Sequence, residues 1–337
     1  MQIRSLFLAL AGAAALASLA ACSVDNSSFP VSHEGSQSRS RIALDYAPSG
    51  VAPQFLERIR VIGQVRGVHP NTPGPRDLAV SDFATGGDEI LDHNYALEQF
   101  ISDPTGCPDG NFYDRNGRLY NADYCGSAVT EYDQSGSLIF TYAAAGMNYP
   151  VDVTTDRAND VYVDDYGPGR ASVVVEFRQG NSTPVESCPT GLANEGIAVD
   201  TSGAVFVAGN DTSTGLGKLL EYSRGLAGCP TPTTLGVTLS FAGALQIDNA
   251  HNLVACDQNV GVDIIPPPYT SIAKTITGAQ DAFHVALNKV NGKIFITDAG
   301  SQTVLVDLYP SGTPFLVLGS ANGLTAPASA TANPSSP

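Results

Sequence analysis

A short pattern recurs six times between Pro75 and Gly319. In each copy a turn related to Pro-x-Gly leads into three mostly apolar residues, and in most copies an Asp follows. The six copies are PRDLAVS (75–81), PDGNFYD (108–114), PVDVTTD (150–156), NEGIAVD (194–200), AGALQID (242–248) and AFHVALN (282–288). Later in the repeat an acid stands beside an apolar or aromatic residue, 42 to 45 residues apart, at Glu131, Glu176, Glu221, Asp263 and Asp307. The chain is therefore built from units of nearly constant length.

The length and content of one unit predict its fold. Repeats of roughly 40 to 45 residues made of short strands are typical of β-propellers. Apolar runs such as Val205–Val207 and Ile294–Ile296 have the length of buried strands, whereas the fourth run of each unit is weaker and more polar. That gradient is expected of a blade whose outer edge meets solvent. We therefore predict an all-β, six-bladed β-propeller of four-stranded antiparallel blades, spanning residues 51–322.

The first unit is shorter than the others, because Pro108 follows Phe100 too closely for a fourth strand between them. The run Phe55–Val65, in which apolar residues alternate with Arg, offers the missing strand. In this interpretation the N-terminus closes the ring. The alternative is that the same run caps the seam of the ring elsewhere.

The repeat resembles the NHL family of propellers. Asn194–Asp200 (NEGIAVD) is similar to the Pro-x-Gly-Ile-Ala-Val-Asp start of those blades, and Tyr162–Asp165 to their Tyr-Val-x-Asp second strand. The resemblance implies a fold and no particular activity.

The two ends have compositions unlike the repeats. Residues 1–21 combine Arg4 with an apolar stretch that ends Leu-Ala-Ala before Cys22, which resembles a bacterial lipoprotein signal with Cys22 as the lipidated residue. An ordinary secretory signal is the alternative. Residues 22–50 are polar and Ser-rich and are expected to form a flexible tether. Residues 323–337 contain few large apolar side chains and are predicted to be a disordered tail. The expected location is the outer membrane, at its periplasmic or cell-surface face.

Charge limits the partners. The sequence has 17 Lys and Arg against 33 Asp and Glu, a net charge of −16. Binding to a nucleic-acid backbone requires clustered positive charge, so no nucleic acid is expected. We expect a monomer that contacts the membrane through its lipid alone and binds a protein or glycan at one propeller face.

The six cysteines include Cys22, which leaves five for an oxidising compartment. Cys188 and Cys229 each precede Pro at matching positions one repeat apart, which predicts a disulfide between neighbouring blades. Cys107 and Cys125 are predicted to close a loop around the first strand of the second unit. Cys256 lies in a buried-strand context and is expected to be a free, buried thiol.

The third position of each turn is expected to surround the mouth of the central channel. The six positions are Asp77, Gly110, Asp152, Gly196, Ala244 and His284. Gly is the structural default there, so Asp77, Asp152 and His284 are the candidate site, with Asn194 and Glu195 on the same rim. Two carboxylates and an imidazole suit a divalent cation, which is the one possible cofactor. Structural roles in turns are the alternative.

A second set of acids recurs at the end of the second strand of most units, at Asp123, Asp165, Asp257 and Asp298. Because they repeat at one place in successive blades, we expect them to accept hydrogen bonds from N–H groups of the following loop rather than to bind Ca²⁺.

Two functions fit these observations. The first is a cell-envelope lipoprotein that acts as a binding or scaffold propeller for a protein or glycan, and it is favoured by the absence of a catalytic signature such as Gly-x-Ser-x-Gly. The alternative is a metal-dependent hydrolase or lactonase, because the ring resembles that of the gluconolactonase family. Sites of that family use a Glu from the first blade with an Asn and an Asp from later blades, so the resemblance implies that Asp77 replaces the Glu, and the turn Asn194–Gly196 loosely matches the Asn-Gly or Asp-Gly turns of the family. The metal ligands expected from the ring positions are Asp77, Asp152 and His284.

Overall fold

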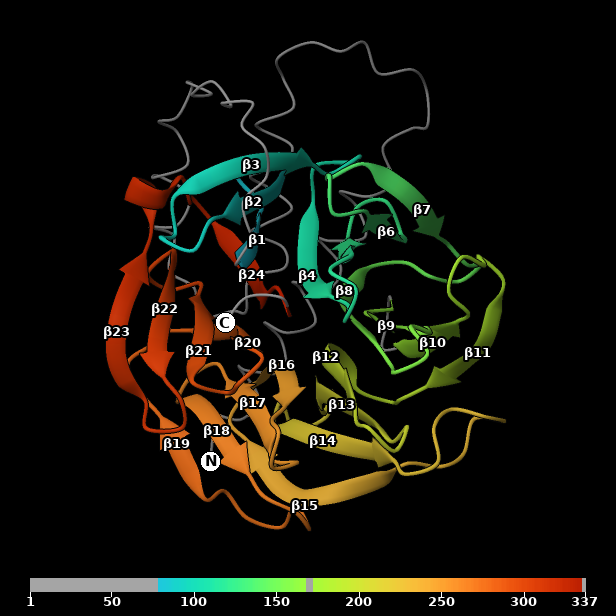
Figure 1. The fold of residues 1–337 in the computed structure, drawn as a ribbon. Coiled ribbons are helices and arrows are strands. Elements are labelled where there is room, and N and C mark those ends of the chain that lie inside the picture. The colour runs from blue at the N-terminus through green and yellow to red at the C-terminus, as the bar shows by residue number, and fades with distance from the viewer. Residues whose placement is uncertain (1–77, 168–171, 335–337) are drawn as a thin grey trace, which may run out of the picture. The chain divides into compact units, whose positions relative to one another are not determined.

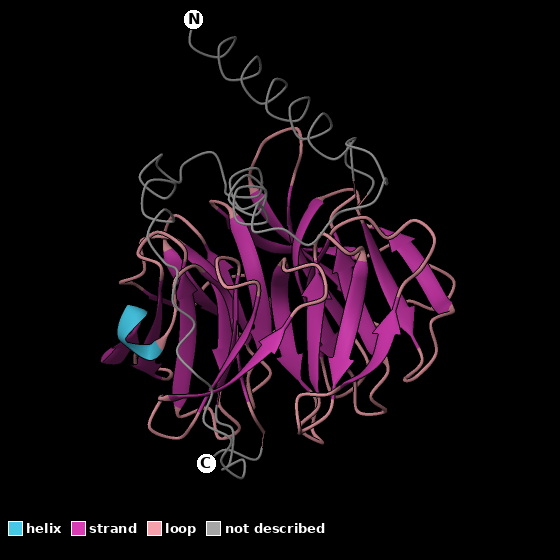
Figure 2. Cartoon of the chain, turned by 90° about the horizontal axis from the view of Figure 1, so that it is seen from above, coloured by secondary structure: helices cyan, strands magenta, loops and turns pink. Residues whose placement is uncertain are grey.

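The computed structural model describes residues 78–167 and 172–334, which form six four-stranded antiparallel sheets around a central axis (Figure 1). The predicted fold class is confirmed. The innermost strands run roughly along that axis, whereas the outermost strands curve around it (Figure 1, Figure 2). In the described part of the chain, no helix is long and apolar enough to cross a membrane.

Each blade is a meander whose first strand lies at the axis, except in blade 1. From the axis outward, blades 1 to 3 are β24 (Pro327–Ala332), β1 (Leu78–Asp82), β2 (Gly87–Leu91), β3 (Leu97–Ser102); β4 (Pro108–Tyr113), β5 (Leu119–Asp123), β6 (Ala128–Tyr132), β7 (Leu138–Tyr142); and β8 (Pro150–Thr155), β9 (Val161–Asp165), β10 (Val173–Phe177), β11 (Pro184–Pro189). Blades 4 to 6 are β12 (Ala193–Val199), β13 (Val205–Asn210), β14 (Gly217–Tyr222), β15 (Thr233–Leu239); β16 (Ala242–Ile247), β17 (Leu253–Asp257), β18 (Gly261–Ile265), β19 (Lys274–Ile276); and β20 (Ala282–Leu287), β21 (Lys293–Asp298), β22 (Thr303–Leu308), β23 (Thr313–Leu318). One short 3₁₀ turn, η2 (Ser320–Asn322), precedes β24.

The core lies between the blades. Each of six buried clusters joins the facing sides of two neighbouring blades. Between blades 2 and 3, for example, the rings of Tyr142 and Phe177 lie 5.6 Å apart and both side chains are fully buried. Such aromatic pairs add about 0.5–1.5 kcal/mol beyond the burial of their area. The apolar runs of the repeat therefore stabilise contacts between blades.

Ring closure differs from the prediction. The innermost strand of blade 1 is β24, from the C-terminus, which pairs antiparallel with β1. The predicted disordered tail at 323–337 and the predicted end of the propeller at 322 are therefore wrong, because residues 327–332 form a buried strand. The sequence of β24, Pro-Ala-Ser-Ala-Thr-Ala, lacks large side chains because neighbouring inner strands crowd this position at the axis. The run Phe55–Val65 lies outside the described residues.

This closure also changes the register of the first unit. Residues 78–82 form the second strand of blade 1, whereas the prediction placed them in the innermost strand. Leu78 pairs with Ala332 at the far end of β24, and Ser329 holds the third position of the inner strand. Blade 1 thus contributes Ser329 to the ring, in place of the predicted Asp77, which lies outside the described residues.

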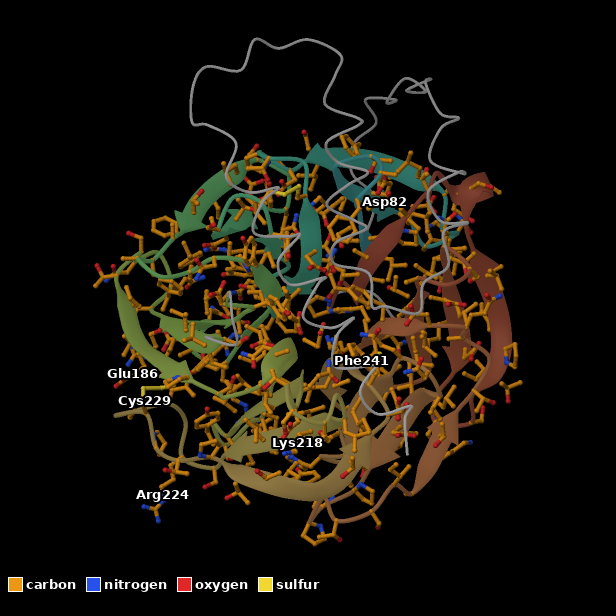
Figure 3. The ribbon with its side chains drawn as sticks, turned by 180° about the vertical axis from the view of Figure 1, so that it is seen from behind. Asp82, Glu186, Lys218, Arg224, Cys229 and Phe241 are labelled. Carbon is orange, nitrogen blue, oxygen red and sulfur yellow. A yellow bond between two sulfur atoms is a disulfide. The ribbon has the colours of Figure 1, made fainter. Side chains whose placement is uncertain are left out.

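The recurring Asp residues hold loops in place. The carboxylate of Asp165 accepts hydrogen bonds from the N–H groups of Asn148 and Tyr149 at 2.8–3.2 Å, and Asp257 and Asp298 do the same in blades 5 and 6. At the ring seam, Asp82 accepts from Thr325 and Ala326 (Figure 3). The structural role is confirmed. The donors named above lie in loops that precede the inner strand, and the predicted bonds from the following loop also occur, from Gly126 to Asp123 and from Gly300 and Ser301 to Asp298.

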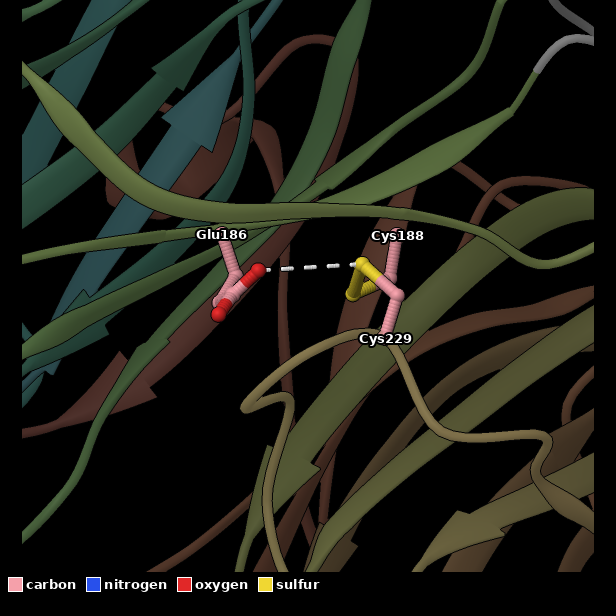
Figure 4. Close-up of side chains that lie close together, drawn as sticks. All are labelled: Glu186, Cys188 and Cys229. Carbon is pink, nitrogen blue, oxygen red and sulfur yellow. Dashed lines mark hydrogen bonds between the residues drawn. A yellow bond between two sulfur atoms is a disulfide. The ribbon is translucent and has the colours of Figure 1, made fainter.

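The cysteine predictions are confirmed. Cys107 bonds to Cys125 and Cys188 to Cys229, with Cα atoms 5.6 and 5.1 Å apart, while Cys256 is free and buried. The second bond joins β11 of blade 3 to the loop between β14 and β15 of blade 4 (Figure 4). Cys22 and the predicted signal and tether lie outside the described residues.

Candidate functional site

The inner strands form the site, and their third positions lie at one level of the channel. Five of these strands carry a bulge or register shift at that level, where the pairing with the second strand is interrupted. Bulges redirect side chains and increase local twist. At Gly196 a Cβ atom would stand 2.5 Å from the Cα of Ala244 in the next blade, so glycine is required there for close packing.

Asp152 and His284 meet across the axis. They belong to β8 of blade 3 and β20 of blade 6, which are opposite blades in the ring of six (Figure 1). His284 Nε2 lies 3.4 Å from Asp152 Oδ1, and both side chains are buried. Of the three predicted site residues, the structure brings these two together.

Asp152 is fixed by two backbone hydrogen bonds. Its Oδ1 accepts from the N–H of Val153 at 2.9 Å, and its Oδ2 accepts from the N–H of Ile197 on the next inner strand at 3.0 Å. At the equivalent position of blade 1, the Ser329 hydroxyl likewise accepts from the next inner strand, from the N–H of Asn111 at 3.1 Å. Part of the role of Asp152 is therefore structural, since it joins neighbouring blades, and its Oδ1 also faces His284.

His284 has one engaged and one unengaged ring nitrogen. Nε2 faces the carboxylate of Asp152, whereas Nδ1 is buried and has no hydrogen-bond partner among the described residues. A carboxylate beside one nitrogen favours the tautomer that carries the proton there. The lone pair of Nδ1 is then left to act as a base or hydrogen-bond acceptor.

Asp164, which the sequence analysis did not select, lies directly behind the pair. It is the strand partner of Asp152 on β9, and its Oδ1 accepts from the amide of Asn194 at 2.6 Å. Burial raises the pKa of Asp164 well above its ordinary value, and repulsion by Asp152 raises it further. The consecutive acids Asp164 and Asp165 were the available signal, but only Asp165 follows the repeat.

The predicted rim residues have other partners. The Oδ1 of Asn194 accepts from the hydroxyl of Thr190 at 2.6 Å while its amide binds Asp164. Glu195 Oε1 accepts from the amide of Asn210 at 3.3 Å. Neither side chain therefore joins Asp152 and His284 as a third ligand in the described contacts.

The described residues do not complete a metal site at the pair. A group of three His, Cys, Asp or Glu side chains with ligand atoms within 4.8 Å of one another occurs, in the described ranges, only at Glu186, Cys188 and Cys229. Those two thiols form a disulfide, so they are not available as thiolate ligands (Figure 4). Among His, Cys, Asp and Glu side chains, the described residues therefore offer two ligands at the pair, fewer than the three protein ligands of a catalytic zinc site.

A central cavity of about 230 Å³ extends from the pair along the channel. Near the pair it is lined by Val153, Ile197 and Leu245, which are almost fully buried. Towards the ends of the inner strands, the lining residues Val199 and Ile247 become partly exposed. The lining thus becomes more exposed towards the face where the inner strands end, and the Asp152–His284 pair lies at the more buried end.

Known proteins share the fold and part of the sequence. An L-arabinolactonase of Azospirillum brasilense is 31% identical over 134 residues, which are 40% of this chain and 36% of that protein. The chain thus matches about a third of the length of this relative. No family model matches the sequence.

Solved structures support the fold. A chain of a nidogen/laminin complex aligns with a TM-score of 0.65 and 15% identity, covering 77% of this chain and 99% of that one. A structure described as a gluconolactonase from Xanthomonas campestris aligns with a TM-score of 0.53 and 15% identity over 63% of this chain and 76% of its own. At these identities the similarity establishes the six-bladed β-propeller and nothing finer.

Proposed function

We propose that this protein hydrolyses a small lactone, a cyclic ester, in the central cavity. The observation that carries the proposal is the Asp152–His284 pair at the deep end of that cavity. Partial similarity to an L-arabinolactonase supports this chemistry over a pure binding role.

The pair supplies acid–base chemistry. Asp152 holds the proton on Nε2 of His284, so that Nδ1 accepts a proton from water as the water oxygen attacks the lactone carbonyl carbon. The C–O bond of the ring then breaks, and the proton passes from Nδ1 to the alkoxide that leaves. The product is one hydroxy acid, with one water added and no other reactant required.

The test is hydrolysis of lactones by purified protein, followed by release of acid. His284→Gln keeps a polar side chain but removes the base, and it should lower kcat/KM by about 10²- to 10⁴-fold. Asp152→Asn should also lower kcat/KM and should shift the pH profile, because the amide no longer fixes the proton on Nε2. His93→Gln is the matched control, since His93 is exposed on the loop between β2 and β3 and does not line the cavity.

Metal dependence is a separate arm of the same assay. Because Asp152 and His284 alone would hold a metal weakly, we expect hydrolysis to be unchanged after dialysis against EDTA. Loss of activity on EDTA treatment, with recovery on adding one divalent cation, would restore the metal-dependent alternative and require ligands from outside the described residues. Equal activity of wild type, His284→Gln and Asp152→Asn would contradict the proposed site.

A binding role is the second candidate. Its supporting observation is the outermost strand β23, where Phe315 and Val317 are more than half exposed, at 55% and 57%. Exposed apolar edge strands pair readily with other chains. If the wild type hydrolyses no lactone, a protein and glycan array should show a ligand whose binding is lost in Phe315→Ser.

Export as a lipoprotein also remains a proposal. The two disulfides support an oxidising compartment. Metabolic labelling with a fatty acid, compared between the wild type and Cys22→Ser, tests lipid attachment.

A further inference from the structure

The cavity differs in charge between its two ends. Among the described residues that line it, Asp152, His284 and Lys289 are the ones that can carry a charge near neutral pH. Asp152 and His284 lie at the more buried end, whereas Lys289 follows β20 in an exposed turn at the other end. A carboxylate therefore stands at one end of the cavity and an ammonium group at the other.

The ammonium group of Lys289 is not engaged by the protein. The described residues include four lysines, and the Nζ atoms of Lys218, Lys274 and Lys293 each have a hydrogen-bond partner. Nζ of Lys289 has neither a hydrogen bond nor an ion pair within the described ranges. Its main chain is held in place, since Asn249 Nδ2 donates to the carbonyl of Lys289 at 3.1 Å.

The turn that carries Lys289 also lacks the acid found in other blades. In blades 2 to 5 the residue before this turn position is an Asp whose Oδ1 accepts from two N–H groups of the turn, at Asp114, Asp156, Asp200 and Asp248. In blade 6 the Oδ1 of Asn288 accepts the corresponding bonds from Gly292 and Lys293. The amide keeps the geometry of the turn without a negative charge beside Lys289.

Two further cations occupy the same turn position in other blades. Arg115 in blade 2 and Arg157 in blade 3 are exposed, and neither takes part in an ion pair among the described residues. The Asp before each Arg offsets part of its charge, so Lys289 has the strongest effect of the three. This face is thus locally positive in a protein whose net charge is −16.

The two end charges act on an anion in the same direction. Asp152 repels a carboxylate from the buried end, and Lys289 attracts it to the exposed end. His284 is neutral in the proposed mechanism and adds no charge. Lys289 lies five positions beyond His284, about 17 Å of extended chain, so it acts on entry and orientation and not on the bond that breaks.

We infer that the substrate is a lactone that carries a carboxylate group, an inference that rests on the proposed function. The uncharged lactone ring enters first and reaches the pair, while the carboxylate stays towards Lys289. Lys289 is a specificity residue in this assignment, and Arg115 and Arg157 add to the attraction at the same face. A neutral lactone receives no such guidance.

The first experiment compares two five-membered lactones that differ only in charge, one with a carboxylate substituent and one with a carboxamide. Wild type should have the higher kcat/KM for the carboxylate. Lys289→Gln should lower that kcat/KM about three- to tenfold and leave kcat unchanged, because the charge acts on association. The carboxamide should respond to neither change, and Lys289→Arg should retain the preference of wild type.

The control variant and salt complete this experiment. Arg224→Gln removes one positive charge at the outer edge of the ring, where Arg224 is exposed and does not line the cavity, and it should have no effect (Figure 3). The preference for the carboxylate should disappear at about 1 M salt, where charges are screened beyond about 3 Å. Equal kcat/KM for the carboxylate in wild type and Lys289→Gln overturns the inference while leaving lactone hydrolysis established.

The second experiment measures binding without reaction, by calorimetry with oxocyclopentanecarboxylate and the corresponding carboxamide. These cyclic ketones have a ring and a carbonyl but no ester bond. Tighter binding of the carboxylate that is weakened by Lys289→Gln, with no lactone hydrolysed, supports the anion site and contradicts the proposed function. Equal binding of the carboxylate by wild type and Lys289→Gln, or no binding, overturns the inference whether or not lactones are hydrolysed.

Discussion

At the scale of single residues, buried carboxylates in this propeller fall into two classes. Those that repeat, such as Asp165 and Asp257, accept backbone hydrogen bonds and fix loops. Those that do not repeat, such as Asp88, Asp152 and Asp164, contact side chains of neighbouring or opposite blades. Departure from the repeat is therefore the better indicator of a site in this chain.

Asp88 makes stability depend on pH. Its carboxylate is fully buried and accepts from Asn111 and Asn121, and burial raises its pKa from 3.8 to about 7. Between pH 4 and 7 the folded state holds a proton at this site that the unfolded state has released. The free energy of unfolding contributed by Asp88 therefore falls as pH rises through this range, and it levels off above pH 7.

We expect Asp88→Asn to remove that dependence. Roughly three pKa units at 1.36 kcal/mol each set an upper bound of about 4 kcal/mol on the change. Urea unfolding of both proteins at pH 4, 5.5 and 7 should show the variant gaining stability relative to wild type as pH rises. A constant difference across the three pH values would contradict this role.

At the scale of elements, ring closure depends on one strand. β24 fills the axis position of blade 1, with Ala328, Ser329 and Ala330 buried. The Ser329 hydroxyl accepts from the N–H of Asn111 and donates to its side-chain oxygen, which ties the closing strand to blade 2. The closure thus combines main-chain pairing with side-chain contacts to blade 2 from Ser329 and from Thr331, whose hydroxyl accepts from the N–H of Tyr113.

Deleting residues 327–337 should prevent formation of a stable ring, because β1 loses its inner partner and buried apolar side chains of blade 1 become exposed. Circular dichroism and size-exclusion chromatography should show unfolded or aggregated protein. A chain that ends at residue 334 keeps β24 and should remain folded. Ser329→Ala, a milder change, should lower the free energy of unfolding by about 1–3 kcal/mol through the lost hydrogen bonds. A truncated chain with native melting behaviour would show that another segment closes the ring.

At the scale of the whole molecule, the blades are held together by the clusters between them and by a disulfide that crosses one interface. Cys188–Cys229 joins blades 3 and 4 across 41 residues, whereas Cys107–Cys125 closes a shorter span of 18 residues. The carboxylate of Glu186 lies beside the crossing bond and accepts from the N–H of Gly228 at 2.8 Å.

Replacing both Cys188 and Cys229 by Ser should lower the free energy of unfolding by about 2–4 kcal/mol, since the unfolded chain regains conformational freedom. Thermal unfolding in the absence of reductant measures this loss. The matched change replaces both Cys107 and Cys125 by Ser. Because that bond closes a shorter loop, its loss should lower the free energy of unfolding by less. Peptide mass spectrometry without reduction should find both bonds, and a bond to Cys256 would contradict the assignment.

The amino-acid sequence by itself determined the number of blades, the strands of blades 2 to 6, the structural role of the repeated Asp residues and both disulfides. These features depend on local patterns that recur at fixed spacing, and equivalent positions in neighbouring blades must lie close together. The sequence also selected Asp152 and His284, because charged or imidazole side chains replaced small residues at one repeat position.

Only the tertiary structure decided how the ring closes and how the site is assembled. The closing strand follows no repeat pattern, since small residues at a crowded axis resemble the composition of a flexible tail. The contact between Asp152 and His284 joins residues 132 positions apart on opposite blades, and Asp164 reaches the pair through strand pairing. Such contacts depend on the curvature of the closed ring, which no local pattern encodes.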